Sequence, residues 1–184
     1  ALPICLAIME GRYDFENASC PNGHTIGKQG AVRGSTATCL RGHSFKTIDA
    51  LAGERPSFEM YAKMVAGPGG SKTYEAISDW DRALYQECEE RLLTLPETSV
   101  RPTGELAPGN NTDQALRWNF REWRDFFNAR QLLSLSLLAT AIRDLPGDGR
   151  EREALCTLFS GTLEFNNLFT SFKGEGTGAV RHMF

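Results

Sequence analysis

The chain has 184 residues, of which 41% are hydrophobic and 23% charged, and its formal net charge is −3. This length fits one domain, or a small module attached to a larger protein, and the hydrophobic fraction is sufficient for a core. The small net charge gives no overall indication of a nucleic-acid or membrane binder. No run of residues approaches the roughly 18 apolar residues that a membrane span needs.

The charge is unevenly distributed along the chain. From Asn17 to Ile48 there are four bases and no acid, whereas the rest of the chain has 16 bases and 23 acids, a balance of −7. A locally basic segment on an acidic body is either an anion-binding patch or a solvated surface, and both interpretations stay open. The four bases are Lys28, Arg33, Arg41 and Lys46.

The opening stretch, Ala1–Met9, is apolar but short, and it lacks the basic start and the cleavage site of a signal peptide. The chain has five cysteines, an odd number. We therefore expect a reducing, cytoplasmic setting with thiols or metal rather than disulfides. Because the chain begins without Met and stops abruptly after Phe184, we expect it to be a piece of a longer protein.

A short repeat lies within the first 50 residues, which are otherwise rich in Gly, Ser and Thr. The pattern Cys-x-x-Gly-His-x-apolar occurs at Cys20–Ile26 and again at Cys39–Phe45. Small zinc sites take thiolate and imidazole ligands from two chelating pairs on tight turns, and the glycine before each histidine permits the positive φ of such a turn. The repeat predicts a zinc site, with Cys5 as an alternative ligand to one histidine. The predicted ligands are Cys20, His24, Cys39 and His43.

A closed four-ligand site is structural, because it has no open position for a substrate. Two thiolates would offset the charge of Zn²⁺, so the four-base excess of the ribbon would survive metal binding. In a polar segment with few large apolar residues, metal binding would be coupled to folding. We predict a zinc-ribbon module with short strands over residues 1–66.

The next elements follow from periodicity and capping. Alternation of Phe58, Met60, Ala62 and Met64 predicts a strand over residues 57–65, and Gly67–Gly70 predicts a turn. Beyond that turn the chain is predicted to be helical. A first helix is capped by Ser78 and ends before Pro96, where a long loop over residues 96–111 begins.

Three further helices are predicted. The second is capped by Thr112 and extends to Phe127, the third is capped by Asn128 and covers Ala129–Leu145, and the fourth covers about residues 150–172. Residues 67–184 should therefore form a helical domain. The predicted fold class is α+β, mainly α, with a small zinc-binding β-ribbon followed by a bundle of about four helices.

Arg117, Arg121 and Arg124 have the spacing i, i+4, i+7 and are expected on one face of the second helix. They form either a phosphate-contacting stripe or a solvated face paired with neighbouring acids. The solvated face is the favoured interpretation. Further towards the C-terminus, one of Asn166 and Asn167 is expected to organise a neighbouring loop, because a buried amide needs hydrogen-bond partners.

No catalytic constellation is present in the sequence. There is no Ser-His-Asp order and no paired-carboxylate motif, and the glycine-rich segment 173–178 lacks the ending of a phosphate-binding loop. Cys88 and Cys156 are expected in the core. No catalytic residue is therefore predicted.

Several segments resemble one known family. They are residues 58–65, 72–77 with 81–85, 110–114, 123–133, 158–169 and 173–184. The most distinctive is Leu-Phe-Ser-Gly-Thr-Leu-Glu-Phe-Asn-Asn-Leu-Phe at 158–169. Together they resemble large bacterial and archaeal adenine-specific DNA methylases with an embedded zinc ribbon, and the likeness covers about Cys20 to the end.

The resemblance implies methyl transfer from S-adenosylmethionine to a base nitrogen in the parent DNA (adenine-N6) methyltransferase. The family's Asp/Asn-Pro-Pro-Tyr/Phe motif and its cofactor loop do not occur here. The chain would thus be an inserted DNA-recognition or structural segment, not catalytic in isolation, packed with the remaining methylase domains. Its DNA contacts would come from Lys28, Arg33, Arg41, Lys46, Arg117, Arg121 and Arg124.

A second hypothesis is a zinc-containing protein–protein interaction module without nucleic-acid contact. The acidic body, with its balance of −7, favours it because that charge repels DNA. An autonomous enzyme is disfavoured because the nucleophile, base and cofactor motifs are missing.

Overall fold

The computed structural model describes residues 19–26, 32–33, 35–56, 58, 60, 62–68, 71–147, 149–173 and 179–181. The chain divides into two compact units. The ribbon unit comprises Met9–Ser57 and Leu106–Arg121. The helical unit comprises Ala1–Ile8, Phe58–Glu105 and Glu122–Phe184. Predicted Cys5 therefore lies outside the described residues.

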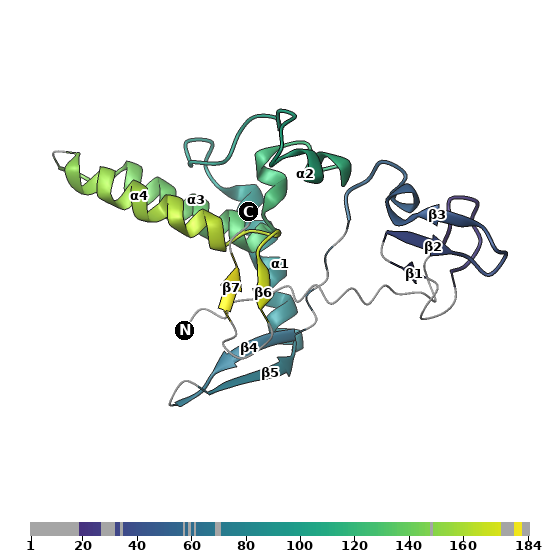
Figure 1. Ribbon diagram of the computed structural model, residues 1–184. Helices are drawn as coiled ribbons and strands as arrows, with labels where there is room; N and C mark the ends of the chain where they lie inside the picture. The colour runs from purple at the N-terminus through teal and green to yellow at the C-terminus, as the bar shows by residue number, and fades with distance from the viewer. Residues whose placement is uncertain are drawn as a thin grey trace. The chain divides into compact units, whose positions relative to one another are not determined.

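The ribbon unit contains a three-stranded antiparallel sheet, shown in Figure 1. Its strands are β1 (Val32–Arg33), β2 (Thr36–Thr38) and β3 (Ser44–Lys46), in the order β1-β2-β3. Ala37 is fully buried and pairs with half-buried Phe45, whereas Thr36 and Thr38 are exposed. The sheet thus has a small apolar face and a polar face. A 3₁₀ helix, η1 (Thr47–Leu51), follows β3.

The ribbon unit also contains the short helix α2 (Asp113–Arg117). Asn119 has φ +66°, and this left-handed residue ends the helix. The backbone then becomes extended at Glu122 before the 3₁₀ helix η3 (Trp123–Phe126), which belongs to the helical unit. The prediction of one continuous helix from Thr112 to Phe127 is therefore wrong, and the Thr112 side chain does not cap α2.

The helical unit contains a two-stranded hairpin of β4 (Ala62–Ala66) and β5 (Lys72–Ala76). Gly67 N–H donates to Ser71 O at 2.7 Å and closes the predicted turn. β4 lies within and just beyond the predicted strand. Residues 72–76 were expected to be helical, and the structure corrects this because their backbone pairs with β4.

Helix α1 (Asp79–Thr94) begins at its predicted cap. The Ser78 hydroxyl accepts from Asp81 N–H, and Asp81 Oδ2 accepts from Ser78 N–H at 2.8 Å. Lys63 of β4 donates to both carboxylate oxygens of Asp81, at 3.1 and 2.8 Å. This buried carboxylate therefore fastens the hairpin to the start of α1.

Asp81 should make the helical unit sensitive to acid. The Lys63 ammonium, together with hydrogen bonds from Ser78, lowers the pKa of the Asp81 carboxyl from 3.8 to about 2. A carboxyl group whose pKa is lower in the folded than in the unfolded chain stabilises the folded state at pH values above the unfolded-state pKa. This contribution is lost as the pH falls from about 4 towards 2. Denaturant unfolding measured at several pH values in that range should show that the free energy of unfolding falls more steeply with decreasing pH in the wild type than in Asp81→Asn. Equal pH slopes would contradict this role.

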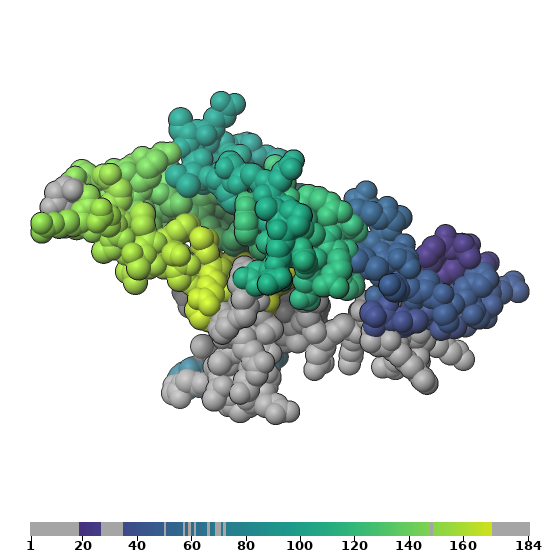
Figure 2. Space-filling model, turned by 45° about the horizontal axis from the view of Figure 1, so that its top comes forward, coloured from purple at the N-terminus to yellow at the C-terminus, as the bar shows by residue number. Residues whose placement is uncertain are grey.

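Helices α3 (Ala129–Arg143) and α4 (Arg150–Phe165) form an antiparallel pair. Figures 1 and 2 both show them side by side, in green and yellow-green. Asn128 caps α3 as predicted, since its side chain accepts from Gln131 N–H at 2.9 Å. The α3 helix packs mainly against α1 and more lightly against α4.

The fourth helix is shorter than predicted. The Asn167 side chain donates to Leu163 O and Glu164 O and accepts from Phe169 N–H, so this buried amide turns the chain away from the helix. The predicted role of an asparagine in organising a loop is confirmed. Residues beyond it form β6 (Ser171–Lys173), which pairs with β7 (Ala179–Arg181). The fold class, α+β and mainly α with four helices among the described residues, is confirmed.

The buried apolar set is modest in both units. Among the described residues of the helical unit it consists of Phe126, Leu133, Leu135 and Ile142, and no described residue of α4 is buried. The predicted core positions of the two helical cysteines are not observed, because Cys88 is half-buried and Cys156 exposed. Within the described part of the chain, none of the helices has the length and apolar character needed to cross a membrane.

Candidate metal centre

Two matching turns of the ribbon unit form the site. In the first, Cys20 N–H donates to His24 O at 2.8 Å and Gly23 N–H donates to Cys20 O at 2.8 Å. In the second, Cys39 N–H donates to His43 O at 3.0 Å, and the N–H of Gly42 donates to Cys39 O at 2.9 Å. The repeated sequence therefore folds into a repeated backbone structure.

The glycines have the backbone conformation that the sequence predicts. Gly23 has φ +78° and Gly42 has φ +82°, a region that residues with a Cβ adopt only at a cost. Leu40 N–H donates to Thr25 O at 3.1 Å and joins the two turns directly. The side chains of both turns consequently converge on one point.

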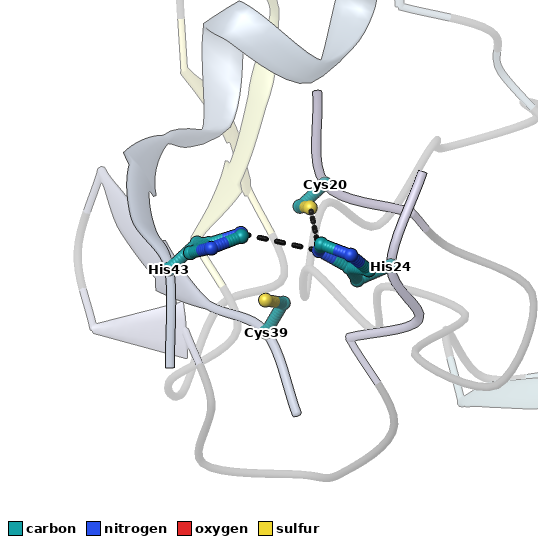
Figure 3. Close-up of side chains that lie close together, drawn as sticks. All are labelled: Cys20, His24, Cys39 and His43. Atoms are coloured by element: carbon teal, nitrogen blue, oxygen red, sulfur yellow. Dashed lines mark hydrogen bonds between the residues drawn. The ribbon is translucent and has the colours of Figure 1, made fainter. Parts of the chain in front are cut away.

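The convergence brings together Cys20, His24, Cys39 and His43, as Figure 3 shows. One ligand atom from each residue lies within 4.8 Å of all the others. The Nδ1 atoms of His24 and His43 are 3.1 Å apart, and Cys20 Sγ lies 3.6 Å from His24 Nδ1. The sequence repeat had identified these four residues, and their arrangement is one that could hold a metal ion.

The donor geometry fits a tetrahedral ion. Metal–sulfur bonds of about 2.3 Å and metal–nitrogen bonds of about 2.0 Å place tetrahedral ligand atoms about 3.3–3.8 Å apart. The His24–His43 separation of 3.1 Å and the Cys20–His24 separation of 3.6 Å lie close to those values. Two imidazole nitrogens 3.1 Å apart face each other either through a shared hydrogen or through a cation that both bind.

Burial divides the site into an inner and an outer half. Cys20 and Cys39 are each 4% exposed, His24 is half-buried and His43 is exposed. Burial on its own raises the pKa of the Cys39 thiol, but hydrogen bonds to its sulfur from the backbone of His43 and Arg41 and from Cys20 lower that pKa below its ordinary value. The thiolate is the form that binds metal.

Gly42→Ala should weaken metal binding about tenfold, because a Cβ in the left-handed region costs about 1–2 kcal/mol. A Cβ there would meet no atom within 4 Å, so the cost comes from the backbone alone. Competition with a chromogenic chelator measures the affinity. Gly161→Ala, in an open position of α4, is the control and should leave the affinity unchanged. Equal affinities of Gly42→Ala and the wild type would contradict the turn's role.

The residues predicted to contact DNA lie in different elements of the structure. Arg41 and Lys46 are exposed, in the second turn and in β3 respectively. Arg33 lies in β1, where its backbone pairs with Thr36, and Thr36 in turn pairs with Lys46. Lys28 lies outside the described residues.

The three later arginines do not share a helix face, because the helix ends after Arg117. Arg117 and Arg121 belong to the ribbon unit, where they donate to Asp113 O and Leu116 O of the α2 segment. Arg124 lies in η3 of the helical unit and pairs with Glu122 at 2.6 Å. The expectation that these three arginines share one helix face is therefore wrong.

Sequence reasoning missed one neighbour of the cluster, Asn22, whose Nδ2 lies 3.3 Å from His43 Nδ1. Only its place in the first Cys-to-His turn could have indicated it.

Comparison with known proteins adds no relative. No family model, curated protein or solved structure matches this chain.

Proposed function

We propose that the four-residue cluster binds one structural zinc ion. Two thiols and two imidazoles on paired turns are a donor set suited to zinc, and four protein ligands leave no position for a substrate. The matched turns, each closed by the same two backbone hydrogen bonds, are the observation that carries this assignment. The described apolar core near the ribbon, including Ile26 and Ala37, is small, so the metal would supply much of the ribbon's stability.

We further propose that the zinc ribbon is the DNA-contacting part of an insert in an S-adenosylmethionine-dependent adenine-specific DNA methyltransferase. The family resemblance supports the parent class, and the exposed bases Arg41 and Lys46 support the contact. The insert would contribute no catalytic residue, and S-adenosylmethionine would bind elsewhere in the parent. We propose the reducing cytoplasm as its setting, since thiols stay free to bind metal there.

Local charge decides where DNA would bind. By sequence the ribbon unit has eight bases and six acids, whereas the helical unit has 12 bases and 17 acids. The acidic excess of the chain lies in the helical unit. Phosphate binding is therefore favoured at the ribbon and disfavoured at the helices.

Fluorescence anisotropy with a DNA duplex at low salt tests this proposal. The zinc-loaded chain should bind, and log K should fall with log salt by about 0.9 per phosphate contact. Arg41→Glu combined with Lys46→Glu should abolish most of the binding. Arg91→Glu, on the acidic helix α1, is the control and should bind as the wild type does. No binding by the wild type, or equal binding by the double variant, would reject the DNA contact.

A second candidate is a protein-interaction module, and the surface of the helical pair favours it. Leu137 and Leu138 of α3 are 44% and 45% exposed, and Leu158 and Phe165 of α4 are 69% and 49% exposed. Figure 2 shows α3 and α4 on the surface of the helical unit. A pull-down that recovers a stoichiometric protein partner without nucleic acid would support this candidate, provided that Leu137→Ser/Leu158→Ser loses that partner.

A further inference from the structure

The two histidines of the metal cluster face it with the same ring nitrogen. Both rings use Nδ1 in the hydrogen-bond contacts within the cluster, at 3.1 Å between the two rings and at 3.6 Å from His24 to Cys20 Sγ. Figure 3 shows both rings directed edge-on at the cluster. A metal ion bound there would take Nδ1 from each, and each Nε2 would carry the ring's remaining N–H.

A metal-bound histidine usually donates its second ring N–H to a carboxylate, a carbonyl or an ordered water. Within the described part of the chain, neither His24 nor His43 makes a hydrogen bond through Nε2. His24 is half-buried, whereas His43 is exposed. The N–H of His43 is therefore the one that an external acceptor can reach.

The charges around His43 select the class of acceptor. The sequence from Asn17 to Ile48 contains no acid, and Arg41 is exposed two residues before His43. The adjacent Ser44 hydroxyl is also exposed and lies 3.0 Å from that of Thr38. A bound metal cation polarises the imidazole and strengthens its N–H as a donor. An imidazole N–H, a guanidinium and hydroxyl groups are all hydrogen-bond donors, and a phosphate oxygen is an acceptor that suits them.

We infer that the Nε2–H of metal-bound His43 donates to a phosphodiester oxygen of duplex DNA, with Arg41 as the second contact to the same backbone. The inference rests on the DNA contact proposed above and makes it depend on the metal. The ion would hold the ribbon together and would also orient one of its DNA contacts. Such a contact positions the ribbon on the duplex and carries no base specificity.

Exchange of each histidine for cysteine separates this role from metal binding. His43→Cys keeps a fourth ligand and loses the N–H, while His24→Cys makes the same chemical and charge change at the half-buried position. Zinc content must stay at one ion per chain in both variants. His43→Cys should bind duplex DNA about tenfold more weakly than His24→Cys, since hydrogen bonds to charged groups are the stronger ones. Because the lost N–H carries no net charge, the salt slope of His43→Cys should equal that of His24→Cys.

The outcomes distinguish this inference from the function on which it rests. If the wild type binds DNA and the two variants bind equally, the His43 contact is wrong and the DNA-binding proposal stands. If the wild type does not bind DNA, both are wrong.

Nuclear magnetic resonance gives a second measurement for the case in which a variant loses zinc. In the zinc-loaded wild type, the Nε2–H resonance of His43 should shift and exchange more slowly when duplex is added, while that of His24 should not change. No change at His43 would overturn the inference. The same shift with inorganic phosphate at equal phosphate concentration would show a free-anion site and overturn the assignment to DNA.

Discussion

The double substitution Cys20→Ser/Cys39→Ser is expected to unfold the ribbon unit while the helices of the helical unit stay folded. Both thiols are 4% exposed and lie at the centre of the cluster. Structural zinc sites contribute an apparent binding free energy of about 10–16 kcal/mol at neutral pH, more than the few buried apolar residues of a small ribbon supply.

Nuclear magnetic resonance measures this directly. In the double variant, the backbone amide resonances of Thr36–Thr38 and Ser44–Lys46 should move to the chemical shifts of an unfolded chain. A chelator added to the wild type should have the same effect. Cys88→Ser/Cys156→Ser is the matched control, since it removes two thiols outside the cluster. It should keep both the zinc and the ribbon. A folded ribbon in the Cys20→Ser/Cys39→Ser variant would show that metal does not stabilise this unit.

Phe126→Ala is expected to destabilise the helical unit by about 3–5 kcal/mol, the usual cost of a large cavity in a core. Phe126 is 3% exposed, and its ring packs edge-to-face against two other aromatic rings. The distance between ring centroids is 4.7 Å to Phe169 and 5.6 Å to Trp123. Its carbonyl accepts from Leu168 N–H at 2.7 Å, so the residue joins η3 to the segment after α4. Among the described residues of this unit, the other buried large apolar side chains are Leu133, Leu135 and Ile142.

Denaturant unfolding followed by helical circular dichroism measures the loss. Phe126→Leu keeps most of the volume and should cost less than about 1.5 kcal/mol. Leu93→Ala, at a side chain 84% exposed on α1, should change the free energy of unfolding by less than about 0.5 kcal/mol. If Phe126→Ala is no more destabilising than Leu93→Ala, the packing described around η3 is incorrect.

The features predictable from the sequence are those encoded by nearby residues. The cluster of Cys20, His24, Cys39 and His43 follows from two seven-residue repeats, because each turn is closed by hydrogen bonds between its own ends. The caps at Ser78 and Asn128 are likewise local, since each side chain bonds to the backbone three residues later. In these places the local chemistry and the final fold agree.

The features that were missed depend on distant partners or on one backbone angle. Asn119 ends α2 with a positive φ, although the apolar spacing from Leu116 to Phe127 continues as in a helix. Its side chain donates to Glu54 O, 65 residues away, and Arg55 lies 6.0 Å from the centre of the Phe120 ring. Periodicity carries no information about such contacts. The strand at 72–76 was missed for a related reason, because it forms by pairing with β4.

The central claim is that Cys20, His24, Cys39 and His43 together bind one zinc ion. X-ray absorption at the zinc edge, on protein purified with its native metal, tests it most directly. The expected result is one zinc per chain with two sulfur neighbours at about 2.3 Å and two nitrogen neighbours at about 2.0 Å. Protein without zinc, or zinc bound by oxygen without sulfur, would contradict the claim.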